Sequence, residues 1–60
     1  MQATQVATYA RALYAAHGDK AEAEAAQKAV AAKAAGQTDQ ARNWQAVRAS
    51  IRAMRGPNQG

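Results

Sequence analysis

Three single glycines, at positions 18, 36 and 56, divide this chain of 60 residues into three segments of similar length. Glycine adopts a positive φ without steric cost, and for this reason it commonly follows the last residue of an α-helix. The segments between the glycines are rich in alanine, the strongest helix former. The spacing therefore predicts an all-α chain with three short helices. We place these helices at residues 4–17, 19–35 and 39–55.

Polar residues that can cap a helix stand near each predicted helix start. Asp19 has Glu22 three residues later, as in a capping box, in which the first side chain accepts hydrogen bonds from backbone amides of the next turn. Thr38 and Asp39 are placed to cap the third helix in the same way, and Thr4 the first. We expect a single helical domain over residues 1–56, followed by a flexible C-terminal tail at 57–60.

Large apolar side chains are scarce in this chain. Hydrophobic residues make up 48% of the sequence, but alanine accounts for 19 of them. The larger ones recur at intervals of three and four residues in the first and third segments, as on one face of a helix. The predicted core consists of Val6, Tyr9, Leu13, Val30, Trp44, Val47, Ile51 and Met54. A core of this size supplies no more than about 3–5 kcal/mol, so we expect a protein partner or a second copy to complete it.

The Ala-rich middle helix is predicted to carry small side chains on two opposite faces. One face holds Ala23, Ala26, Val30 and Ala34, and the other holds Ala21, Ala25, Ala29 and Ala32. Two such faces would let a neighbouring helix approach closely on each side, in an antiparallel up-down-up bundle. The alanines also admit a plainer interpretation, helix propensity alone. The alternative architecture is an extended helical hairpin plus a third helix.

The net charge of +4 lies entirely in residues 31–60. Arg48, Arg52 and Arg55 share one side of the predicted third helix, where they suit an acidic protein or a phosphate backbone. Bases near the end of a helix also complement the helix dipole, which gives a purely structural interpretation. The candidate partner-binding residues are Tyr14, Arg48, Arg52 and Arg55. The candidate nucleic-acid-binding residues, for weak and strongly salt-dependent binding, are Arg42, Arg48, Arg52 and Arg55.

Catalytic and metal-binding patterns are missing from the sequence. The chain has no cysteine, and its one histidine, His17, is expected to bond to carbonyls at the end of its helix. Glu22 and Glu24 stand two residues apart, on roughly opposite sides of a helix, and cannot act as an acid–base pair. No catalytic residue, cofactor, metal site or small-molecule substrate is therefore predicted. No apolar run is long enough for a membrane span, and we expect a cytoplasmic protein.

The run from Tyr14 to Asp19, followed by Ala23, resembles the helix-turn-helix junction of tetratricopeptide repeats, in which an aromatic residue, a turn glycine and a later alanine recur at these offsets. The likeness covers about a third of the chain. Gln27 stands where the repeat has an aromatic residue, Val30 stands where it has a small one, and no second repeat follows. The resemblance implies a helical hairpin across Gly18 and a role in protein binding.

The sequence thus favours a small non-enzymatic helical protein that serves as a protein-interaction module or as an accessory subunit of a larger assembly. The alternative is a basic helical protein associated with nucleic acid.

Overall fold

The computed structural model describes residues 3–56, which form three α-helices and no strand. The helices are α1 (Ala3–His17), α2 (Lys20–Ala34) and α3 (Thr38–Met54). The all-α prediction is confirmed, and each helix end differs from its predicted position by no more than one residue. No helix within residues 3–56 combines the length and apolar character needed to cross a bilayer. The predicted tail at 57–60 lies outside the described residues.

The glycines end the helices as the sequence predicts. All three have positive φ, with values of 59° at Gly18, 79° at Gly36 and 97° at Gly56. After α2, the Gln37 N–H donates to the Ala32 carbonyl at 2.8 Å and the Gly36 N–H donates to the Lys33 carbonyl at 3.0 Å. These two bonds form a Schellman motif, which satisfies carbonyls that the helix leaves without a partner. The chain can therefore reverse direction within the three residues 35–37.

The predicted capping box at Asp19 was wrong. An N-cap residue normally has extended φ and ψ, which point its side chain back at the amides of the first turn. Asp19 instead has helical angles, φ −62° and ψ −22°, and its side chain makes no capping hydrogen bond. The Ala21 N–H bonds to the Gly18 carbonyl at 3.0 Å. Gly18 has already turned the chain, so α2 begins without a side-chain cap.

The caps predicted for the other two helices were also wrong. Gln37 is the N-cap of α3 and makes no side-chain capping bond, while Thr38 and Asp39 lie within the first turn. Thr4 lies inside α1, where its carbonyl accepts a 3.0 Å hydrogen bond from the Thr8 hydroxyl. Asp39 still places a negative charge at the positive end of the α3 dipole, which is favourable without a hydrogen bond.

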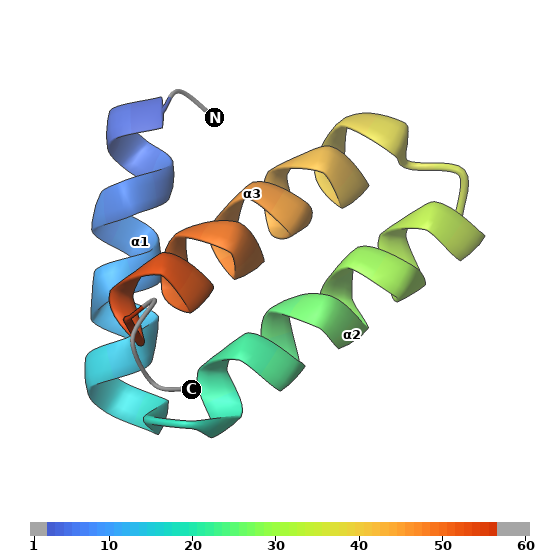
Figure 1. The fold of residues 1–60 in the computed structure, drawn as a ribbon. Helices are drawn as coiled ribbons and strands as arrows, with labels where there is room; N and C mark the ends of the chain where they lie inside the picture. Colours follow the sequence, from blue (N-terminus) through green and yellow to red (C-terminus); the bar gives the residue numbers. More distant parts are fainter. Residues whose placement is uncertain (1–2, 57–60) are drawn as a thin grey trace.

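Helices α2 and α3 form an antiparallel hairpin, and α1 is inclined across the end of the hairpin where α2 begins and α3 finishes (Figure 1). The contact between α2 and α3 is the most extensive, that between α1 and α3 is intermediate, and that between α1 and α2 is the smallest. All three pairs of helices are in contact, so the fold is a compact all-α bundle in which α1 is inclined to the hairpin. The two helices joined across Gly18, where the repeat-like resemblance implied a hairpin, make the smallest contact of the three pairs.

The core is built largely from alanine. The buried hydrophobic residues are Val6, Ala10, Ala21, Ala25, Ala29, Ala32, Ala41, Val47 and Ile51. Val47 and Ile51 are the largest side chains that are fully enclosed, and Leu13, Tyr14 and Trp44 are partly buried against them. The core prediction is confirmed for Val6, Val47 and Ile51. Small side chains let α2 and α3 approach closely, so that little apolar volume suffices to fill the space between them.

Three residues of the predicted core lie at the surface instead. The exposed fractions are 41% for Tyr9, 68% for Val30 and 37% for Met54. In α2 the alanine face that begins at Ala21 packs inward, which turns Val30 on the opposite face toward solvent. In α1, Val6 and Ala10 face the hairpin and Tyr9 lies to one side of them. Met54 is the last residue of α3, and its side chain lies at the surface there.

Candidate functional site

Each helix contributes one residue to a patch that we call the aromatic surface, made of Tyr9, Lys28 and Trp44. The rings of Tyr9 in α1 and Trp44 in α3 meet edge to face, with centroids 5.6 Å apart and planes inclined by 72°. The Lys28 ammonium of α2 lies 5.8 Å from the centroid of the Trp44 ring. Trp44 is partly buried against the core, and the exposed residues Tyr9 and Lys28 border it.

A contact between two side chains next to this surface joins the end of α1 to α2. His17 Nδ1 lies 2.6 Å from Glu24 Oε1, and the two side chains are 44% and 38% exposed. Glu24 precedes Lys28 by four residues, which places both on one side of α2. The sequence predicts that His17 bonds to backbone carbonyls, and the structure shows this contact with the Glu24 side chain instead. The contact between His17 and Glu24 therefore links the C-terminal end of α1 to α2.

A second cluster, the arginine groove, consists of Glu22, Arg48, Arg52 and Arg55. Arg55 Nη1 donates a 2.6 Å hydrogen bond to Glu22 Oε1, and Arg48 Nε lies 3.8 Å from Glu22 Oε2. The Glu22 side chain is only 18% exposed because these arginines cover it. The remaining wall of this open groove is formed by Ala49, Ala53 and Gly56. The groove therefore connects the start of α2 to the end of α3.

The groove carries more positive charge than its carboxylate neutralises. Three guanidinium groups stand beside one Glu22. Among the residues that the structure describes, Arg52 has no carboxylate within ion-pair distance. It follows Arg48 by four residues and precedes Arg55 by three, so all three lie along one side of α3. The ion pairs of Arg48 and Arg55 explain part of the basic stripe structurally and leave the charge of Arg52 without a local partner.

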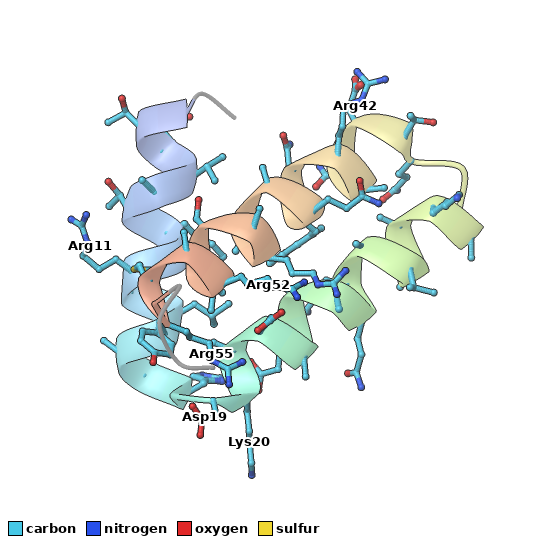
Figure 2. All side chains as sticks on the ribbon, viewed as in Figure 1. Arg11, Asp19, Lys20, Arg42, Arg52 and Arg55 are labelled. Atoms are coloured by element: carbon cyan, nitrogen blue, oxygen red, sulfur yellow. The ribbon has the colours of Figure 1, made fainter. Side chains whose placement is uncertain are left out.

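The four arginines predicted for nucleic acid do not form one surface. Figure 2 shows Arg55 beside the beginning of α2 and Arg52 a turn earlier on α3, whereas Arg42 projects from the other end of that helix. Ten residues separate Arg42 from Arg52, which corresponds to about 15 Å along a helix. Tyr14, predicted to bind a partner, is partly buried against the core. The structure thus brings together Arg48, Arg52 and Arg55 and sets Arg42 and Tyr14 apart from them.

Sequence reasoning missed Glu22 and Lys28 as members of these surfaces. Glu22 had a usable signal, because acids gather at the start of the second helix and bases at the end of the third. An antiparallel hairpin brings those two ends together. Lys28 had no comparable signal, since its position over Trp44 depends on how far one helix is shifted along the other.

Comparisons with protein-family models, with curated proteins and with solved structures found no match to this chain. Within residues 3–56, no three side chains of His, Asp or Glu are grouped so that they could hold a metal ion. The aromatic surface and the arginine groove are therefore the two places from which a function can be argued.

Proposed function

We propose that this chain is a small non-enzymatic cytoplasmic protein that acts as an interaction module or accessory subunit and docks a protein partner on the aromatic surface. The observation that carries the proposal is the 41% exposure of Tyr9, edge to face with Trp44. The core contains few large side chains. Even so, two of the three aromatic residues in the chain, Tyr9 and Trp44, meet at the surface. Tyrosine and tryptophan in such positions are the most frequent anchors of protein interfaces.

The charge around the aromatic surface defines the partner. Lys28 lies over the Trp44 ring, so a docking segment that sets a carboxylate beside an apolar side chain would match both groups. The chain also has a net charge of +4, which repels a second copy and attracts an acidic protein. The occupant we propose is accordingly an acidic partner protein with an apolar residue next to an Asp or Glu.

An accessory role also agrees with the energetics of a chain this small. A core in which alanine predominates provides about 3–5 kcal/mol at most. A partner present at 100 times its dissociation constant would add about 2.7 kcal/mol to the stability of the folded state. Binding and folding are then coupled, because the partner covers apolar surface that the isolated chain leaves in water.

The test is to capture partners from native extract on the immobilised chain and to titrate the purified captured protein against single-site variants. Tyr9→Ala and Lys28→Gln should each weaken binding at least about tenfold, a loss of about 1.4 kcal/mol. Val30→Ala, which changes an exposed residue on the outer face of α2, is the matched control and should bind like the wild type. Circular dichroism verifies that each variant is helical.

Two results would reject this proposal. One is a captured partner whose affinity is the same for the wild type, Tyr9→Ala and Lys28→Gln. The other is sedimentation equilibrium showing a stable dimer that Tyr9→Ala dissociates, because a second copy would then occupy the surface in place of an acidic partner.

Nucleic-acid association is the second candidate function, since Arg48, Arg52 and Arg55 line one groove. Glu22 offsets one of these charges, and the distant Arg42 would have to reach a different phosphate. Few phosphates would be neutralised, so DNA binding should be weak, and its affinity should fall with salt with a slope of about −2 to −3 in a plot of log K against log salt. The absence of binding at low salt would exclude this function.

A further inference from the structure

The proposed function uses one side of α2 and leaves the arginine groove unexplained. Glu22 and Glu24 stand two residues apart and take partners on opposite sides of the helix, the arginines of α3 and His17 of α1. The aromatic surface lies on the side of Glu24 and Lys28. The arginine groove lies on the side of Glu22, so a ligand in the groove need not compete with a protein on the aromatic surface.

We propose that the arginine groove binds a phosphate monoester dianion. Its three guanidinium groups and one carboxylate leave two positive charges in excess. A phosphate monoester carries a charge of about −1.5 to −2 at neutral pH, which matches this excess. A guanidinium group offers five N–H donors in a planar fork that suits phosphate oxygens. Arg52, which has no ion pair among the described residues, is the first contact for the incoming anion.

Glu22 acts as a positioning residue in this site. One of its oxygens accepts the hydrogen bond from Arg55 Nη1, and the other faces Arg48 Nε. A single carboxylate cannot occupy the ten N–H donors of two guanidinium groups. The donors that remain are held in place at little further entropic cost, which favours binding of a second anion. Removing Glu22 would therefore raise the net charge of the groove and at the same time release the side chains that it orders.

The shape of the groove suits a compact ligand. Ala49 and Ala53 lie four residues apart on α3 between the arginines, and both are too small to obstruct the approach of an anion. The three arginines of the groove lie within about two turns of helix at the end of α3, whereas Arg42 lies near its beginning. This local grouping favours one doubly charged phosphate over an extended chain of singly charged phosphodiesters.

The proposal is tested by titrating the full chain with O-phosphoserine at low ionic strength and following arginine Nε–H signals by NMR. We expect saturable shifts at Arg48, Arg52 and Arg55 with a dissociation constant in the millimolar range. Dimethyl phosphate, a singly charged diester, should bind at least about tenfold more weakly because it loses half of the charge. Sodium chloride at matched ionic strength should not reproduce the shifts.

The matched variants are Arg52→Gln and Arg42→Gln, which remove the same charge from the same helix. Arg52→Gln should weaken O-phosphoserine binding at least about tenfold, as expected for loss of a charge-assisted contact, whereas Arg42→Gln should leave it nearly unchanged. Equal losses in both variants, or shifts that do not saturate, would overturn the proposal in favour of diffuse attraction by net charge. Tighter binding of single-stranded DNA, lost in Arg42→Gln, would overturn it in favour of nucleic acid.

Two further ligands identify the source of the phosphate. Inorganic phosphate, O-phosphoserine and adenosine monophosphate all present the same dianion. Tighter binding of O-phosphoserine than of the other two would support a phosphorylated side chain as the natural ligand, and tighter binding of adenosine monophosphate would support a nucleotide. Because Tyr9→Ala leaves the groove intact, it should bind O-phosphoserine like the wild type, which separates this test from that of the protein-docking function.

Discussion

Glu22, in the first turn of α2, accepts a 2.6 Å hydrogen bond from Arg55, the residue that directly follows α3. The two residues are 33 positions apart in the sequence. Their contact closes the end of the hairpin opposite the Gly36 turn, at the place where α1 crosses (Figure 1). The hairpin is thus held at one end by its connecting turn and at the other by an ion pair.

The Glu22→Gln variant tests this closure. It removes the carboxylate that faces Arg48 and Arg55, and because both arginines are substantially exposed, the free energy of unfolding should fall by only about 0.5–1 kcal/mol. Urea denaturation measures the difference. At about 1 M NaCl the difference should largely vanish, because the screening length falls to about 3 Å. Glu24→Gln, which removes the same charge from a more exposed pair, should cost less; an equal cost would contradict this interpretation.

Two Ala→Leu variants on opposite faces of α2 test which alanine face packs inward. Ala25 is fully buried between the helices, whereas Ala23 is exposed. Overpacking by Ala25→Leu should cost about 1–3 kcal/mol. Leucine is nearly as good a helix former as alanine, so Ala23→Leu should change stability by no more than about 0.5 kcal/mol. Thermal unfolding followed by circular dichroism compares them, and the reverse order would mean that the helix is rotated.

Ile51→Ala probes the centre of the core. This side chain is fully enclosed, and truncation of a buried isoleucine costs about 2–5 kcal/mol. The loss is comparable to the whole expected stability of the chain, so helicity measured by far-ultraviolet circular dichroism at 25 °C should fall markedly. Val30→Ala serves as the control, because Val30 is 68% exposed and alanine is the better helix former. A Val30→Ala variant that is clearly less stable than the wild type would mean that Val30 is part of the core after all.

Gly36→Ala tests the turn between α2 and α3. Gly36 has φ +79°, and a Cβ built there meets no atom within 4 Å. The cost is therefore conformational alone, about 1–2 kcal/mol. D-alanine at this position favours positive φ and restricts the unfolded chain, so it should instead stabilise the protein by about 0.4–1 kcal/mol. Chemical synthesis of the chain permits both measurements, and destabilisation by both isomers would contradict a purely conformational effect.

The helix limits could be predicted because their cause is local. Gly18, Gly36 and Gly56 end the helices through their own backbone conformation, which depends little on the rest of the fold. The same reasoning failed for Asp19, because its capping role depended on φ and ψ that the preceding turn altered. Local chemistry thus located the ends of the helices but not the hydrogen bonds made there.

The choice of buried face could not be predicted, because alanine provides almost no contrast between the two sides of α2. Ala21 and Ala25 could pack inward as readily as Ala23 and Val30 on the evidence of size alone. The direction in which α1 crosses the hairpin decided whether Val6 or Tyr9 faced inward. The arginine side of the site was half predictable: helical spacing grouped Arg48, Arg52 and Arg55, but the carboxylate that organises them lies on another helix.

The three-residue connection between α2 and α3 also bears on how quickly the chain reaches its native state. The most extensive packing in the molecule joins helices that are neighbours in the sequence, so little loop-closure entropy opposes it. Chains dominated by such near-neighbour pairing reach equilibrium within about microseconds to milliseconds. Docking of α1 on α3 has to span the intervening helix, and temperature-jump relaxation should find it the later event.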